Sequence, residues 1–121
     1  MKITLISPYS DITAFGVRSI AAFIKKVGFE AQLIFLSDQE FDSKAKSGSI
    51  YRYNDSILEQ IVNLCEDSQL IGMSLFTCHF DRIVQLTQAI KGRIDVPIMW
   101  GGIHPTIKPA EALQYCDMVC L

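Results

Sequence analysis

The sequence predicts an α/β fold organised around a five-stranded parallel β-sheet. The first observation behind this fold class is a set of five short apolar segments that alternate with segments of helical periodicity. The second is that these apolar segments are continuous, without regular alternation of polar and apolar residues, which is typical of strands covered on both faces. The predicted strands are residues 3–7, 31–36, 70–76, 97–100 and 118–121.

Four helices are predicted between these strands. The first ends at Gly28, and its apolar face consists of Val17, Ile20, Ala21, Ile24 and Val27. The second opens with a capping-box pattern at residues 56–59, and the fourth starts at Pro109, where a missing N–H costs a helix little. The third carries an apolar face made of Phe80, Ile83, Val84, Thr87 and Ile90.

Alternating strands and helices predict a particular topology. Crossovers between parallel strands are right-handed, which places helices on both faces of the sheet. Five such strands favour a flavodoxin-like (Rossmann-like) three-layer sandwich with strand order 2-1-3-4-5. Pro97 fits because proline is tolerated at the start of a strand. The polar residues 41–53 predict a long surface loop.

The size and charge of the chain exclude several classes. The 121 residues suffice for one domain with a hydrophobic core. The net charge of −2 leaves no basic face for nucleic acid. No apolar run reaches the ~18 residues that a membrane span needs, and the apolar start is too short for a signal peptide. We therefore expect a cytoplasmic protein with no nucleic-acid or membrane partner.

The chain stops at Leu121, at the edge of the fifth predicted strand. A domain of this topology normally continues with a fifth helix that covers the sheet. We expect residues 1–121 to form a single domain that is a piece of a longer multidomain enzyme.

The cysteines form neither a C-x-x-C pair nor a three-cysteine cluster motif. Free cysteines in a cytoplasmic protein are usually small core residues, and we expect this of Cys65, Cys78, Cys116 and Cys120. Cys78 follows a predicted strand and has an alternative interpretation as a residue near a ligand.

The most informative segment follows the fourth predicted strand: Trp100, Gly101, Gly102, Ile103, His104, Pro105 and Thr106. Two glycines at a strand end allow the backbone to approach another object closely. In an open α/β sheet, ligands bind at the carboxyl ends of the strands. The first and third strands bring hydroxyls to the same edge, at Ser7 and Ser74. This edge suits a large, mostly neutral ligand. The sequence has no phosphate-binding G-x-x-x-x-G-K-[ST] motif and no G-x-G-x-x-G turn after the first strand.

Each of these residues also has a purely structural interpretation. Ser7 and Ser74 are compatible with turns, while Asp11 and Thr106 are compatible with helix caps. His104 and His79 are compatible with loop or helix-start positions, and Trp100 with core packing. No nucleophile, base and orienting group can be assembled, so we expect no catalytic residue and no protein ligand to a metal in this chain.

Three motifs together resemble the N-terminal cobalamin (B12)-binding domain of B12-dependent radical SAM enzymes. They are Ser7-Pro8 after the first strand, residues 71–77 in the third, and Gly101-Gly102-Ile103-His104-Pro105-Thr106 after the fourth. The family includes the anaerobic Mg-protoporphyrin IX monomethyl ester oxidative cyclase-like group. The likeness extends over nearly the whole chain.

The resemblance implies that the corrin ring rests on the carboxyl edge of the sheet and that the nucleotide tail lies along the sheet near small side chains. It implies a cofactor site made of Ser7, Pro8, Thr13, Ser74, Leu75, Thr77, Gly101, Gly102, His104 and Thr106. Replacing Gly101 or Gly102 by valine is then expected to abolish corrin binding while leaving the fold intact.

Other B12 domains place a cobalt-ligating histidine in a D-x-H-x-x-G frame after the first strand. Here the corresponding frame, residues 11–16, has Thr13 at that position. Threonine has no imidazole nitrogen, so the resemblance implies that the lower face of cobalt is water-bound or unligated. His104 is then a loop residue.

Two functions remain open from the sequence. In the first, the chain is the cobalamin-binding module of a radical SAM enzyme whose downstream barrel carries a [4Fe-4S] cluster and S-adenosylmethionine and performs methyl transfer or ring rearrangement and cyclase chemistry on a small molecule. In the second, it is a stand-alone or regulatory flavodoxin-like module that binds another small molecule or a partner protein. Fold class alone does not separate them.

Overall fold

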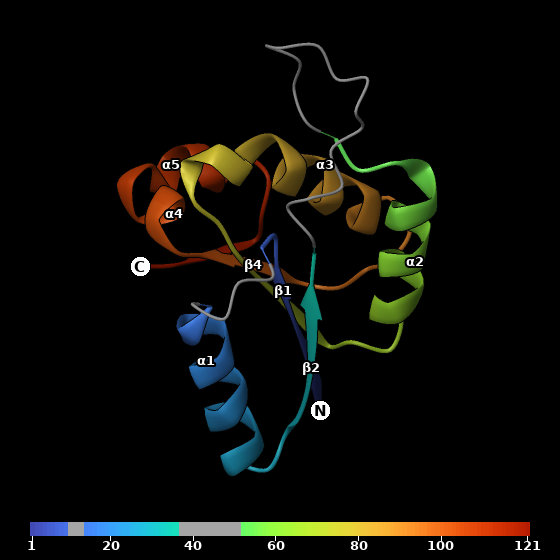
Figure 1. Cartoon of the computed structure of the whole chain (residues 1–121), viewed down its shortest axis with the longest axis vertical. Helices are drawn as coiled ribbons and strands as arrows, with labels where there is room; N and C mark the ends of the chain where they lie inside the picture. Colours follow the sequence, from blue (N-terminus) through green and yellow to red (C-terminus); the bar gives the residue numbers. More distant parts are fainter. Residues whose placement is uncertain (10–13, 37–51) are drawn as a thin grey trace.

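The computed structural model describes residues 1–9, 14–36 and 52–121 (Figure 1). Within them, one five-stranded sheet has the order β2-β1-β3-β4-β5, and every neighbouring pair is parallel. The predicted fold class and strand order are therefore confirmed. The strands are β1 (Lys2–Ser7), β2 (Glu30–Phe35), β3 (Leu70–Ser74), β4 (Ile98–Gly101) and β5 (Met118–Cys120).

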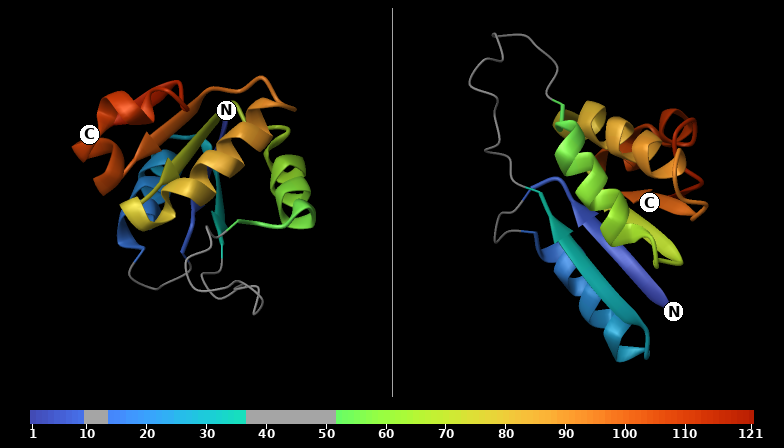
Figure 2. Two further views of the ribbon diagram at one scale, coloured as in Figure 1. Left: turned by 90° about the horizontal axis from the view of Figure 1, so that it is seen from above. Right: turned by 90° about the vertical axis from the view of Figure 1, so that its right-hand side faces the viewer.

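Helices cover both faces of the sheet. Figure 2 shows α1 on one side and α2 with α3 on the other, which makes the three layers. The helices are α1 (Phe15–Lys26), α2 (Asp55–Cys65), α3 (Phe80–Lys91), α4 (Ile103–Ile107) and α5 (Pro109–Ala112), with a 3₁₀ turn, η1 (Thr77–His79), before α3.

The buried face of α1 is narrower than predicted. Val17, Ala21 and Ile24 are buried, whereas Ile20 and Val27 are 52% and 49% exposed. The five residues predicted on one apolar face do share one side of the helix, but the sheet covers only the central arc of that side, and Ile20 and Val27 lie on its flank.

The two flanks of α1 face different parts of the sheet. The Arg18 guanidinium lies 4.8 Å from the centroid of the Phe35 ring, so its flank faces the β2 edge. At 100° per residue, Ile20, Phe23 and Val27 lie on the opposite flank. That flank therefore faces the side on which β3 lies.

Two other helix starts differ from the prediction. Helix α2 is capped by Asn54, whose Oδ1 accepts a hydrogen bond from the Ile57 N–H at 2.9 Å, so the capping box expected at residues 56–59 was wrong. Helix α5 starts at Pro109 as predicted, but α4 precedes it in a segment interpreted as a loop. Pro105 is compatible with α4 because it stands in the first turn, where N–H groups have no helical partner.

The larger core cluster lies between the sheet and the helices α2, α3 and α5. Trp100 is fully buried there, and its Nε1–H donates to Thr87 Oγ1 at 3.1 Å. This confirms the core interpretation of Trp100. The third predicted helix face is largely confirmed, since Ile83, Thr87 and Ile90 are buried in α3.

The smaller core cluster packs α1 against the β1 and β2 side of the sheet. It leaves the same face of β3, β4 and β5 without a described helix over it. Alternate residues along these strands point to that face, and all of them are half-buried or exposed. Leu70 of β3 packs against the smaller core cluster. We call the rest of this region the open strip; it consists of Gly72, Ser74, Met99, Gly101, Met118 and Cys120.

Part of the predicted surface loop can be assessed. Residues 41–51 lie outside the described residues, and Tyr53 at the end of the loop is only 4% exposed, so its surface placement was wrong. In the described part of the chain, no helix has the length and apolar character needed to cross a membrane.

Candidate functional site

The carboxyl ends of β1, β3 and β4 lie side by side in the sheet. Ser74 pairs with Gly101 across β3 and β4, and Ile6 pairs with Met73 across β1 and β3. Continuing that register by one residue places Ser7 beside Ser74. The structure thus brings the three predicted strand-end residues Ser7, Ser74 and Gly101 to one edge, with their side-chain positions on the α1 side of the sheet.

The β1 end is the most enclosed part of this edge. Ser7 and Pro8 are both buried. The Ser7 Oγ donates a hydrogen bond to the Tyr9 carbonyl oxygen at 2.8 Å, which fits the turn interpretation of this serine. Thr13 and Asp11, the other candidates from this loop, lie outside the described residues.

The β3 end presents alternating environments. Ser74 is half-buried, Leu75 is 1% exposed in the core, and Thr77 is exposed at the start of η1. The Leu75 N–H donates to the Gly101 carbonyl oxygen at 3.1 Å, which extends the contact between β3 and β4 past the strand ends. Of these three residues, Ser74 and Thr77 offer hydroxyls at the edge.

The two glycines have different roles. Gly102 has φ of +101°, and a β-carbon there would lie 2.9 Å from the Leu75 carbonyl oxygen. The object that approaches Gly102 closely is therefore the protein's own backbone, and the expectation that valine at Gly102 leaves the fold intact was wrong. At Gly101, a β-carbon would lie 3.7 Å from Cys120 Cβ, an ordinary contact. Gly101 thus leaves space on the open strip.

His104 is buried at 3% exposure, and its ring contacts Thr77, Glu111 and Phe80. Its Nδ1 lies 3.1 Å from Thr77 Oγ1, and its Nε2 lies 3.0 Å from Glu111 Oε1. The Phe80 ring lies 4.8 Å away, centroid to centroid. Sequence reasoning missed Glu111. His104 and Glu111 lie on different helices, α4 and α5, so no spacing in the sequence indicated their contact.

Thr106 is exposed and lies within α4. Its Oγ1 donates to the carbonyl oxygen of Gly102, the N-cap residue, at 2.8 Å, so it stabilises the first turn of α4. The alternative interpretation, that Thr106 caps the helix at Pro109, was wrong because Lys108 is the N-cap residue there.

Exposed apolar side chains also occur around this edge, and sequence reasoning did not single them out. Phe76 precedes η1 at 40% exposure, and Ile103 and Ile107 of α4 are 51% and 66% exposed. Tyr9 stacks on His79 at 5.5 Å between ring centroids, next to Phe76. The edge therefore combines hydroxyls with apolar surface, as a large amphipathic ligand requires.

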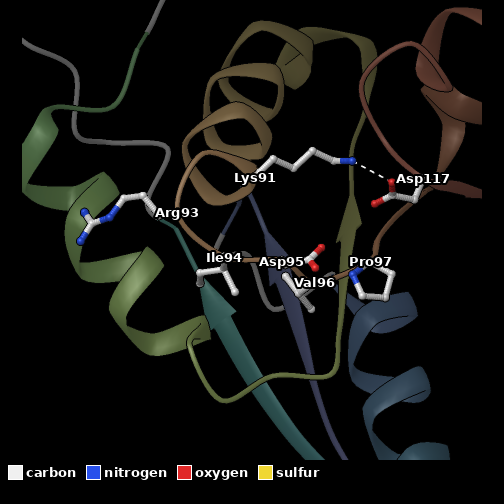
Figure 3. A pocket seen from close by; sticks show the side chains of 7 residues that line it. All are labelled: Lys91, Arg93, Ile94, Asp95, Val96, Pro97 and Asp117. Atoms are coloured by element: carbon white, nitrogen blue, oxygen red, sulfur yellow. Dashed lines mark hydrogen bonds and ion pairs between the residues drawn. The ribbon is translucent and has the colours of Figure 1, made fainter.

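A cavity of about 670 Å³ lies at the other edge of the sheet, before β4 and β5 (Figure 3). Its charged wall contains the Lys91–Asp117 ion pair, with 2.8 Å between Nζ and Oδ1. Lys91 donates a hydrogen bond to Asp117, and the Ile98 N–H donates to Asp117 Oδ2. These two hydrogen bonds stabilise the carboxylate and hold the pKa of Asp117 below its usual range. This cavity contains none of the sequence-predicted site residues.

The cysteines divide into two pairs. Cys65 and Cys116 are buried, as predicted, and burial raises the pKa of the Cys65 thiol to about 11. Cys78 and Cys120 are exposed, so the core interpretation was wrong for them. Among the described residues, no group of three or more His, Cys, Asp or Glu could hold a metal ion.

The chain was compared with known families and structures. The family model described as B12 binding domain matches residues 1–121. A solved cobalamin-binding protein from Desulfitobacterium hafniense DCB-2 superimposes with a TM-score of 0.67 at 17% identity over 98% of this chain and 52% of that one. A fusion carrying the yeast Spc42 trimeric coiled-coil segment gives a TM-score of 0.59 at 17% identity, covering 98% of this chain and 66% of that one.

At this identity, both structural matches establish the fold. This chain spans about half the length of the first matched structure. The curated proteins contain no match to the sequence.

Proposed function

The chain belongs to the B12-binding domain family, and we propose that it holds cobalamin with the corrin ring on the carboxyl edge of the sheet and the nucleotide tail along the open strip. The observation that carries this placement is the uncovered sheet face beside that edge. There α1 leaves β3 to β5 without a covering helix, and Gly101 leaves space above the sheet, whereas the Leu5 side chain fills the space above Gly72.

The residues at the edge fit a corrin in chemical terms. A corrin ring presents an apolar macrocycle surrounded by amide groups, which need both hydrogen-bond partners and apolar surface. Ser74 and Thr77 would supply hydroxyls, and Phe76, Ile103 and Ile107 would supply apolar contact. When bound, cobalamin supplies the reactive cobalt–carbon chemistry, and the protein supplies binding and orientation.

The open strip fits the tail for a related reason. Its surface near the edge consists of Gly101 and Ser74, and the exposed flank of α1 adds Ile20 and Phe23 on the side facing β3. Small residues beside apolar ones leave room for a flat heterocyclic ring. Without a ligand, this much half-exposed apolar surface would remain in contact with water.

His104 would support the site from beneath. Both of its ring nitrogens are engaged, with Thr77 and with Glu111, and its ring is buried against Phe80. A cobalt ligand requires a free imidazole nitrogen. We therefore assign His104 no bond to cobalt, as the sequence analysis expected, although its interpretation as a loop residue was wrong because it lies in α4.

A pair of leucine substitutions tests the placement on the open strip. Gly101→Leu adds bulk to the strip, and Ala22→Leu adds similar bulk to the exposed face of α1. We expect Gly101→Leu to remain folded and to weaken hydroxocobalamin binding by about tenfold or more, with Ala22→Leu unchanged. Equal affinities of the wild-type chain and the folded Gly101→Leu variant would overturn this placement.

We further propose that the domain serves a radical SAM barrel in the same polypeptide, with methyl transfer or ring rearrangement and cyclase chemistry on a small molecule. The three motifs that resemble the radical SAM branch support this proposal. The test uses the full-length protein purified without oxygen. About four iron and four sulfide per chain, together with formation of 5′-deoxyadenosine from S-adenosylmethionine under reduction, are expected. Their absence would overturn the radical SAM part and leave cobalamin binding intact.

A further inference from the structure

The buried contact of His104 with Thr77 and Glu111 links the β3 end to α5. The Nδ1 of His104 is 3.1 Å from Thr77 Oγ1, and its Nε2 is 3.0 Å from Glu111 Oε1. Thr77 and Glu111 are 34 positions apart in the sequence, and the imidazole connects them. Of the three side chains, that of His104 is buried, while Thr77 is exposed at the edge of the sheet.

The chemistry of the partners fixes the proton positions in the neutral imidazole. A glutamate carboxylate only accepts hydrogen bonds, so the proton lies on Nε2. Nδ1 then carries a lone pair and accepts a hydrogen bond. Thr77 must therefore donate its hydroxyl proton to His104.

This arrangement limits what Thr77 can do at the edge. A threonine hydroxyl has one proton and two acceptor lone pairs. Because the hydroxyl proton is already engaged in the hydrogen bond to His104, the hydroxyl presents only lone pairs to a ligand. It will accept hydrogen bonds from N–H or O–H donors and will not donate to carbonyl oxygens.

We propose that Glu111 and His104 form a relay that fixes the Thr77 hydroxyl as an acceptor for an amide N–H donor of the bound cofactor. This proposal rests on the proposed cobalamin function, because the corrin periphery carries primary amides. Glu111 and His104 are positioning residues, and Thr77 makes the contact. The second carboxylate oxygen of Glu111 lies 3.9 Å from Lys108 Nζ, at the surface end of the relay.

The first arm of the test needs no cofactor. At pH 8, the ¹⁵N chemical shifts of the His104 ring in the wild-type chain report its tautomer. A protonated Nε2 and an unprotonated Nδ1 are expected. A proton on Nδ1 would overturn the relay, whatever the chain binds.

The second arm measures hydroxocobalamin affinity in a double-mutant cycle. Thr77→Val, which keeps the shape but removes the hydroxyl, is expected to weaken binding about three- to tenfold. Thr77→Ser is expected to retain wild-type affinity. Glu111→Met is expected to weaken binding by a similar factor in the wild-type background and to have no further effect beside Thr77→Val.

The outcomes separate the two proposals. If the wild-type chain binds no cobalamin, the proposed function fails, while the tautomer still tests the relay. If cobalamin binds equally well to the wild-type chain and Thr77→Val, the acceptor role is overturned and cobalamin binding stands. A Glu111→Met effect of the same size in both backgrounds would show that Glu111 does not act through Thr77. If Glu111→Met does not fold, the cobalamin affinities of Thr77→Val and Thr77→Ser and the tautomer of His104 still test the proposal.

Discussion

The backbone of Gly102 packs directly against the backbone of Leu75. A β-carbon on Gly102 would lie 2.9 Å from the Leu75 carbonyl oxygen and 3.1 Å from its nitrogen. The same carbonyl oxygen accepts a hydrogen bond from the His104 N–H at 3.3 Å. This contact joins the ends of β3 and β4 and sets the position of α4, on which the exposed side of the candidate site depends.

We predict that Gly102→Ala destabilises the chain by about 2 kcal/mol or more, because φ of +101° is open to glycine alone and the methyl group would meet backbone atoms. Gly101→Ala is the matched control and should change the free energy of unfolding by less than about 1 kcal/mol. Urea denaturation of both variants measures this. Equal destabilisation would contradict the distinct roles of the two glycines.

The hydrogen bond from Trp100 to Thr87 gives a second prediction. Thr87→Val leaves the buried Nε1–H without its partner, which costs about 1–3 kcal/mol. Trp100 is the sole tryptophan, so its indole N–H gives one resonance that reports the bond directly. We expect that resonance to shift in Thr87→Val and to stay near its wild-type position in Thr87→Ser. An unmoved resonance in the valine variant would refute the bond.

The lowered pKa of Asp117 predicts a loss of stability in acid. Its native pKa lies below that of the unfolded chain, because Lys91 and the Ile98 N–H stabilise the carboxylate. This contribution is present above the unfolded value of about 3.9 and is lost as the pH falls through the native value. The ion pair is partly exposed, so its contribution is below about 1 kcal/mol.

Thermal unfolding of Asp117→Asn at pH 7 and pH 3 measures this effect. The variant should be less stable than the wild-type chain at pH 7, and its stability should change less between the two pH values. Some pH dependence will remain, because Lys2 lowers the pKa of Asp67 in the same way. Identical pH dependence in variant and wild type would rule out the Asp117 contribution.

Thiol reactivity should separate the cysteines by burial. Burial raises the pKa of Cys65 to about 11, and burial also raises that of Cys116, so both thiols are protonated and inaccessible at pH 8. Titration of the native chain with Ellman's reagent should detect the two exposed thiols rapidly and all four after unfolding. A Cys78→Ser, Cys120→Ser double variant should show no rapid phase. A rapid phase in it would mean that a buried thiol is accessible.

The sheet could be predicted from the sequence because its strands are continuous apolar segments whose length and order depend on local composition. Features that depend on a distant neighbour could not. The glycine at position 102 is visible in the sequence, but the object that fills the space beside it, the backbone of Leu75, becomes known only when β3 and β4 are paired.

The candidate site was predicted in part for the same reason. The strand-end hydroxyls and Gly101 follow from topology alone, since parallel strands share one carboxyl edge. The Glu111 partner of His104 did not, because the two residues lie on different helices, α4 and α5, and their contact depends on how these helices pack. The exposure of Ile20 and Val27 depends on how much of the sheet α1 covers, which apolar periodicity does not report.

The most direct test of the central claim is an amide NMR titration of the ¹⁵N-labelled chain with hydroxocobalamin. We predict saturable binding with the largest shift changes at Ser74, Thr77 and Gly101, and little change at Lys91 and Asp117 on the opposite edge of the sheet. Absence of binding, or changes concentrated around Lys91 and Asp117, would contradict the assignment of the cobalamin site to the carboxyl edge and the open strip.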